Sequence, residues 1–169
     1  MDVSDLLVEA YGRVPDLVRT AVEGLSADQL HRAPGPGANT VAWTVWHLTR
    51  VQDHHLSEVL GEEQLWVTQG WARRFGREPD PADTGYGHTP AQVAALRAEE
   101  ARTLIDYFDA VHARTLAFLR TLTPPDLDRI VDERWDPPVT LGVRLVSVVD
   151  DDVQHAGQAA YVRGLLERS

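Results

Sequence analysis

The chain contains no cysteine and no lysine, and this narrows the chemistry open to it. Without cysteine it forms no disulfide, carries no thiolate nucleophile of its own and builds no cysteine-ligated zinc site. Its 16 basic side chains are therefore all arginine, against 26 acidic ones, and the formal net charge is -10. Nucleic-acid binding depends on clustered basic residues, so we expect no nucleic-acid partner.

Long apolar runs are also missing from the chain. No stretch approaches the roughly 20 apolar residues that a membrane-spanning helix needs, so we expect no membrane insertion. The stretch Met1–Asp5 has acidic residues where a secretory signal has basic ones, and we expect a cytoplasmic protein. The 169 residues, 43% of them hydrophobic, are enough for one domain, which we expect to span 1–169.

Apolar side chains recur at helical spacing in four segments, which predicts long amphipathic helices. Pro15 should kink or divide the first segment, and Thr89–Gln92 has the cap, first-turn proline and capping-box glutamine of a helix start. No segment alternates as strands in a hairpin do. We therefore predict an all-α four-helix bundle with a long connection between helices 2 and 3. The expected helices cover about 3–25, 39–60, 89–122 and 140–166, with a short helix near 71–75.

The apolar face of the fourth predicted helix is interrupted by acidic residues and a histidine. Asp151 and His155 are four residues apart, so their side chains meet on one face. Buried carboxylates are costly unless they are paired or bind a metal. His47, on the second predicted helix, can supply a third ligand. Two histidines and a carboxylate with open positions suit zinc or another divalent transition metal such as nickel.

Two alternatives to this site stay open at the level of sequence. Asp152 lies three residues before His155 and is a rival carboxylate, because Glu-x-x-His pairs also bind metals in helical bundles. Asp151 and His155 can also form a simple helix salt bridge, with Asp150–Asp152 as a solvated face.

The other histidines have weaker claims to a metal. His54 lies seven residues after His47, about 10.5 Å along a helix, too far for both to bind one ion. A solvated or salt-bridged surface cluster is the expectation for Asp53, His54, His55 and Glu58. His88 is expected in the long connection.

The sequence resembles the DinB/YfiT-like family of four-helix-bundle metalloenzymes. The resemblance is carried by Asn39–Trp43 leading to Trp46–Leu48, and by Asp151–Gln158. It covers nearly the whole chain. The segment Gln69–Gly76 is most similar to the actinobacterial branch related to mycothiol-dependent maleylpyruvate isomerase.

This resemblance implies a metal site and a reaction. The family commonly binds a divalent ion through one histidine of the second helix and a His-x-x-x-His pair of the fourth, which by position become His47, Asp151 and His155. This chain departs at Asp151, where the isomerase branch has a glutamate. Characterised relatives use zinc to activate a low-molecular-weight thiol, mycothiol or bacillithiol, for isomerisation or S-transfer. The resemblance also implies a small-molecule substrate and a homodimer.

Further residues and functions complete these expectations. Gln158 is expected to contact a ligand or the substrate, and Arg73, Arg74 and Arg144 to orient an anionic cosubstrate. A hydrolase that activates water at the same site is one alternative. A stress-related bundle that binds a partner without catalysis is another. The expected pocket walls are Trp43, Trp71 and Trp135.

Overall fold

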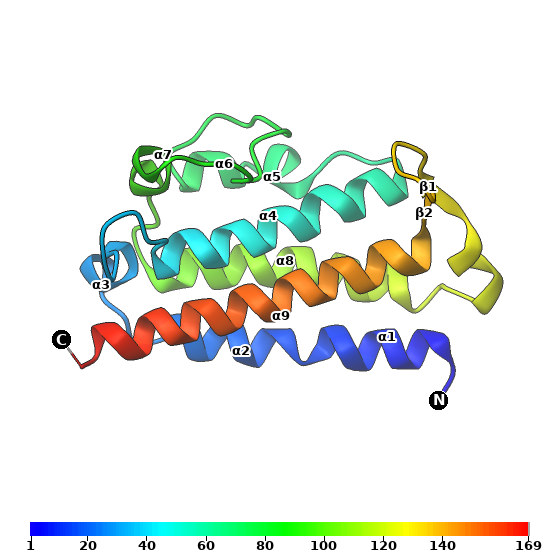
Figure 1. The fold of residues 1–169 in the computed structure, drawn as a ribbon, viewed down its shortest axis with the longest axis horizontal. Coiled ribbons are helices and arrows are strands. Elements are labelled where there is room, and N and C mark those ends of the chain that lie inside the picture. The colour runs from blue at the N-terminus through cyan, green and yellow to red at the C-terminus, as the bar shows by residue number, and fades with distance from the viewer. Residues whose placement is uncertain (169) are drawn as a thin grey trace.

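The computed structural model describes residues 1–168 and has four long helical rods side by side (Figure 1). The rods are α1 with α2, α4, α8 and α9. They close a ring in which α9 packs on α2 and α4, and α8 packs on α4 and on the first rod. The all-α four-helix bundle is therefore confirmed. None of the helices in this part of the chain is long and apolar enough to cross a membrane.

Short elements join the rods and cover one side of the bundle. The elements α5 to α7 lie along α4, and a small hairpin closes the end of the bundle near the N-terminus (Figure 1). The elements are α1 (Val3–Gly12), α2 (Val14–Val22), α3 (Ala27–His31), α4 (Val41–Leu60), α5 (Leu65–Thr68), α6 (Trp71–Arg74), α7 (Pro90–Ala95), α8 (Ala101–Leu119), the 3-10 helix η1 (Pro124–Asp128), β1 (Ile130–Asp132), β2 (Val139–Thr140) and α9 (Leu141–Leu166).

The first rod divides at Arg13, as predicted from Pro15. Asp2 and Asp5 start α1 with a reciprocal capping box, in which each carboxylate accepts the other residue's backbone N–H. Pro15 lies in the first turn of α2, where its missing N–H has no partner to lose. Both halves keep buried apolar faces, so the division preserves the core.

The central helix of the bundle is α4. It begins where the Thr40 hydroxyl accepts the backbone N–H of Trp43 at 3.1 Å, and it ends at Gly61, whose φ is +66°. Every residue from 41 to 50 is buried. A helix covered on all sides lies inside the protein, and here the covers are α8, α9 and the 61–89 connection.

The third rod differs from its prediction, because the segment 89–122 forms two helices rather than one. The Thr89 cap starts α7 as predicted, but the chain becomes extended at Leu96 and reaches α8 only after five residues. Leu96 and Ala98 are buried, and the Ala98 backbone N–H donates to His31 Nε2 at 3.1 Å. Tertiary burial of this linker overrides the local helical pattern.

The hairpin of β1 and β2 is a second difference, since no strands are predicted. The pair is antiparallel, with Ile130 opposite Thr140. Strands of three and two residues are too short for an alternating pattern to be visible in the sequence. Trp135, in the turn, is 65% exposed, so this expected pocket wall faces solvent.

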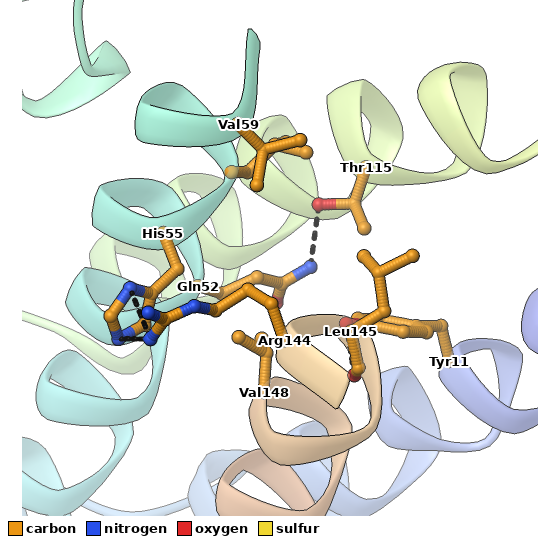
Figure 2. A pocket seen from close by; sticks show the side chains of 9 residues that line it. Tyr11, Gln52, His55, Val59, Thr115, Arg144, Leu145 and Val148 are labelled. Atoms are coloured by element: carbon orange, nitrogen blue, oxygen red, sulfur yellow. Dashed lines mark hydrogen bonds between the residues drawn. The ribbon is translucent and has the colours of Figure 1, made fainter. Parts of the chain in front are cut away.

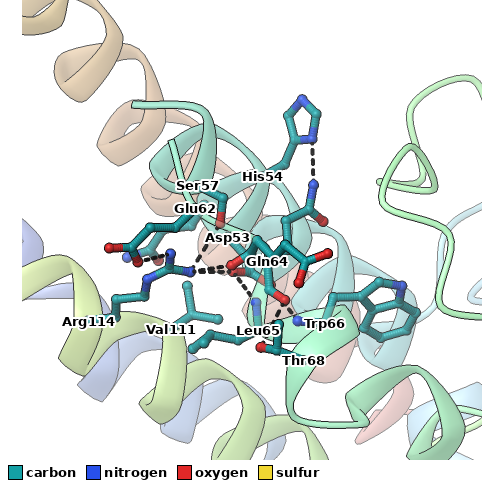
Figure 3. A network of polar contacts seen from close by, with 12 residues as sticks. Asp53, His54, Ser57, Glu62, Gln64, Leu65, Trp66, Thr68, Val111 and Arg114 are labelled. Carbon is teal, nitrogen blue, oxygen red and sulfur yellow. Dashed lines mark hydrogen bonds and ion pairs between the residues drawn. The ribbon is translucent and has the colours of Figure 1, made fainter. Parts of the chain in front are cut away.

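A buried carboxylate, Asp53 of α4, holds the start of the long connection (Figure 3). Its two oxygens accept the backbone N–H groups of Leu65 and Trp66 at 3.0 and 2.8 Å. The Tyr107 hydroxyl of α8 donates to it at 2.9 Å, and the Arg114 guanidinium lies 3.6 Å away. The expectation that Asp53 belongs to a surface cluster is wrong, because its side chain is fully buried.

Arg50, one turn before Asp53 and also fully buried, holds the end of the same connection. It lies 3.6 Å from the Asp53 carboxylate and donates to the backbone carbonyls of Asp83 and Pro81 at 3.0 and 3.2 Å. Its guanidinium also lies over the ring of Trp66, 4.7 Å from the centroid. One buried ion pair thus fixes both ends of the 62–84 segment on α4.

Replacing Asp53 with alanine should lower the free energy of unfolding by about 3–5 kcal/mol, because buried Arg50 would lose its charge partner. Urea unfolding followed by circular dichroism measures this loss. Glu9→Ala, which breaks an exposed ion pair with Arg13, should lower it by less than about 1 kcal/mol. Equal losses in the two variants would contradict a special role for the buried pair.

Candidate metal centre

Three predicted ligands converge between α4 and α9. His47 projects from α4, and Asp151 and His155 project from adjacent turns of α9, which packs on α4. One possible ligand atom from each lies within 4.8 Å of the others. His155 Nε2 is 3.5 Å from the Asp151 carboxylate, and the two imidazole rings meet edge to face at 4.8 Å.

Hydrogen bonds at Nδ1 of each ring determine which ring nitrogen can bind a metal. His47 Nδ1 lies 2.5 Å from the backbone carbonyl of Thr84, which can only accept, so Nδ1 carries the proton. His155 Nδ1 lies 2.9 Å from Gln158 Oε1 and likewise donates. In each neutral ring the lone pair is then on Nε2. A metal ligand is usually prepared in this way, with its other nitrogen bonded to an oxygen.

The carboxylate of Asp151 has one oxygen in contact with His155 and one without a partner. Within residues 1–168, Asp151 Oδ2 is buried and accepts no hydrogen bond. A buried carboxylate oxygen without a partner is costly, and a cation at the cluster would satisfy it. Two imidazole nitrogens and one carboxylate fit zinc and related divalent metals, with further coordination positions left open.

The two histidines have pKa values displaced in opposite directions. Burial lowers the pKa of His47, and the carbonyl of Thr84 opposes this only partly. The hydrogen bond with Asp151 raises the pKa of His155. His47 is therefore neutral near pH 7, as metal binding requires, whereas a metal at His155 competes with a proton.

Asp152, the rival carboxylate of the sequence, is not part of this cluster. It is fully buried, and neither of its oxygens has a hydrogen-bond partner in the described part of the chain. Burial, with the neighbouring charge of Asp151, raises the pKa of Asp152 well above its usual value. The geometry favours Asp151 over Asp152 as the ligand.

The 62–88 connection covers His47 in a way that the sequence does not reveal. Gly85 lies directly on the ring, because a Cβ atom there would be 2.9 Å from His47 Nδ1 and 2.8 Å from Trp46. Trp43 stacks on His47 with centroids 4.8 Å apart, and its indole N–H donates to His88. His88, expected in the connection, does lie there, but its side chain is buried. No sequence motif marks a backbone carbonyl or a glycine as the support of a ligand.

Comparison with known proteins agrees with this architecture. The family model of the DinB superfamily matches residues 10–159. The chain belongs to the DinB superfamily. This match does not single out the branch of the mycothiol-dependent isomerases. No curated protein matches the chain.

Two solved structures have the fold of this DinB chain. A conserved protein from Enterococcus faecalis is 32% identical, with a TM-score of 0.91 over 100% of this chain and 99% of that one. YfiT from Bacillus subtilis is 20% identical, with a TM-score of 0.64 over 94% of this chain and 85% of its own. It is described as a probable metal-dependent hydrolase with an unusual four-helix bundle topology.

A second group of possible ligands in this DinB protein, His54, His55 and Glu58, is arranged differently. The Gln64 side-chain amide donates to the Pro81 carbonyl at 3.0 Å, which fixes its orientation, and it also donates to His54 Nδ1 at 3.0 Å (Figure 3). The proton of neutral His54 is therefore on Nε2, the nitrogen that faces Glu58. The lone pair on Nδ1 already accepts the hydrogen bond from Gln64, so His54 has no nitrogen available for a metal.

Arg144 further disfavours a cation at this second group. Its guanidinium lies 3.2 Å from His55 Nδ1 (Figure 2), and it also lies 2.9 Å from the Asp132 carboxylate. Burial, followed by this positive charge, lowers the pKa of His55. The expected salt-bridged cluster of His54, His55 and Glu58 is thus present, without Asp53.

The arginines expected to orient a cosubstrate lie elsewhere. Arg144 borders a small cavity of about 10 Å³, room for about one water molecule (Figure 2). Arg73 and Arg74 are exposed on α6, where Arg74 lies over the ring of Trp71 at 4.6 Å. No hydrogen bond or ion pair joins the three arginines to the cluster of His47, Asp151 and His155 within residues 1–168. Trp71 packs on Tyr107 rather than on the cluster.

In the metal-free protein, Asp151→Asn should lower the pKa of His155, because the variant loses the charged acceptor that raises it. A raised pKa means that the folded state holds the proton more tightly than the unfolded state. His155 therefore stabilises the fold below its ordinary pKa of 6.5, and this contribution is lost as pH rises through the folded pKa.

Titration of the imidazole signals by NMR measures both pKa values directly. His112, whose pKa is lowered by burial in α8, serves as the internal control and should not change. An unchanged His155 pKa in the variant would show that Asp151 does not engage His155.

Proposed function

We propose that this DinB protein is a metal-dependent enzyme whose His47, Asp151 and His155 hold one divalent transition metal, zinc or nickel. The observation that carries the proposal is the arrangement of donors. Both Nε2 atoms carry the lone pair of the neutral ring, one carboxylate oxygen lacks a partner within residues 1–168, and the three groups lie within 4.8 Å. A helix salt bridge does not require that the Nδ1 atom of each histidine be hydrogen-bonded to an oxygen, whereas metal-binding histidines usually have this second bond.

The proposed reaction is S-transfer or isomerisation with a low-molecular-weight thiol of the mycothiol type. A divalent metal bound here would supply Lewis acidity that lowers the pKa of a thiol or of water. Because the chain has no cysteine, the thiol must come from a small cosubstrate. The protein's own residues hold the site in place: Thr84 and Gln158 orient the imidazoles, and Trp43 shields His47 from water.

A hydrolase that uses water at the same site is the second candidate. It is favoured by the description of YfiT, whose fold this chain shares. Turnover distinguishes the two reactions. A set of esters and epoxides is assayed with and without added thiol. Turnover that requires the thiol supports S-transfer, and turnover without thiol supports hydrolysis.

The family resemblance also leads us to propose a cytoplasmic homodimer. A strip of exposed apolar side chains between α1 and α9 supports a contact with a second copy. Leu6, Val146 and Val153 are each more than 40% exposed there.

Metal content is the direct test of the proposed centre. Wild-type protein without a tag should bind about one zinc or nickel ion per chain, measured by elemental analysis and by competition with a coloured chelator. His155→Ala should lower the metal affinity by at least about 100-fold, because it removes a ligand itself and not merely a residue that hydrogen-bonds to a ligand.

His54→Ala is the matched control, since it removes a histidine from the second group of possible ligands. It should leave metal binding unchanged. Equal metal affinity in wild type and His155→Ala would favour the non-catalytic binding bundle. So would the absence of bound metal from the wild type and both variants.

A second prediction concerns the glycine that lies on His47. Gly85→Ala should weaken metal binding by about tenfold or more, because its Cβ would collide with the ring. Gly87→Ala is its control: Gly87 also has a positive φ, of +75°, but no atom lies within 4 Å of its added Cβ.

Both variants should lose about 1–2 kcal/mol of stability from the left-handed backbone, and Gly85→Ala should lose more because its Cβ collides with Trp46 and His47, as measured by thermal unfolding. The loss of metal affinity should be confined to Gly85→Ala. An equal loss of affinity in both variants would contradict the contact with His47.

A further inference from the structure

A groove borders the metal centre on one side. It lies between the C-terminal half of α9, the start of α4 and the loop before α4. We call it the amide groove, after the side-chain amides of Asn39, Gln154 and Gln158 that line it. Val162 and Leu165 form part of its apolar wall.

The amide groove and the metal centre share Gln158. Its Oε1 accepts the Nδ1 proton of His155, while the side chain itself lines the groove. Thr44, at the opposite wall, lies three residues before His47 and therefore about one helical turn away. A molecule in the groove would be within one helical turn of both histidines.

The lining of the amide groove is uncharged. It contains no acidic or basic side chain among residues 1–168. Arg163, the basic residue beside it on α9, donates to the backbone carbonyls of Thr20 and Glu23 and pairs with Glu167. Buried ligand charge needs an opposite charge, and an overall charge of -10 repels anions further.

The amides retain free hydrogen-bonding groups. Gln158 uses its oxygen for His155, so its NH2 group can donate to a ligand. Gln154 uses its NH2 group for Asp150, so its oxygen can accept. Tyr161, 69% exposed, adds an uncovered ring and hydroxyl. Donors, acceptors and apolar surface lie side by side without a formal charge.

We infer that the amide groove is the substrate site of the metal centre and that it takes an uncharged organic molecule with amide, hydroxyl or carbonyl groups. This inference rests on the proposed function, since it concerns the same centre. It replaces the expectation of an anionic cosubstrate held by Arg73, Arg74 and Arg144, because none of them lines the groove.

Gly157 gives a way to fill the groove without disturbing the fold. It lies in α9 on the groove wall, and no atom lies within 4 Å of an added Cβ. Gly164 is a matched control, because it is also a glycine of α9 with open space around it, and it borders a different depression. Leucine at either position should favour the helix, so both variants should fold.

The experiment uses cobalt-loaded wild type, Gly157→Leu and Gly164→Leu. N-acetylcysteamine, an uncharged thiol with an amide, is titrated while the cobalt absorption spectrum is recorded. Its Kd should rise by about tenfold or more in Gly157→Leu and stay unchanged in Gly164→Leu, because only the first loses the groove. Azide, too small to reach the groove, should bind all three proteins equally.

A charged probe tests the class of ligand. The anionic thiol 2-mercaptoethanesulfonate should bind the wild type more weakly than N-acetylcysteamine does. Equal affinity of N-acetylcysteamine for the three proteins, or tighter binding of the sulfonate, would overturn the inference while leaving the metal centre intact. Failure of the wild type to take up cobalt would instead overturn the proposed function, and the inference with it.

Discussion

Asp53 places a carboxylate in the middle of α4, away from water, and the surrounding chain is arranged to satisfy its charge. Two backbone N–H groups of the long connection, a tyrosine hydroxyl and two arginines converge on it. The connection would otherwise be a polar loop with few reasons to lie on a helix. Because the buried charge needs these partners, the connection is held in one position relative to α4.

The position of the loop also affects the proposed metal centre, through the backbone that follows Pro81. Arg50, paired with Asp53, holds the carbonyls of Pro81 and Asp83. The next carbonyl, that of Thr84, determines that the proton of neutral His47 is on Nδ1. Gly85, which follows Thr84, lies on the His47 ring. The protonation of one proposed ligand, His47, therefore depends on an ion pair whose members lie about one and two turns further along the same helix.

The sequence predicts the parts of this protein that follow local rules. Helix starts with caps, the division at Pro15 and the shared face of Asp151 and His155 depend on neighbours within four residues. It does not predict the break before α8 or the burial of Asp53, because both depend on segments far away in the chain. Residue types alone also do not show which of two similar groups is prepared to bind a metal, since each contains two histidines and one carboxylate. They differ in which ring nitrogen already has a partner, and distant loop atoms decide this.

One helix, α9, carries two of the three proposed metal ligands and much of the amide groove, on different faces. Asp151 and His155 face α4, whereas Gly157 and Tyr161 face outward and leave the core unchanged. Substitutions at the outward positions can alter what enters the groove without touching the ligands or the packing. If the proposed centre is catalytic, a lineage of such bundles can therefore acquire new substrates by exchanging a few surface residues, while the three ligand positions are inherited intact.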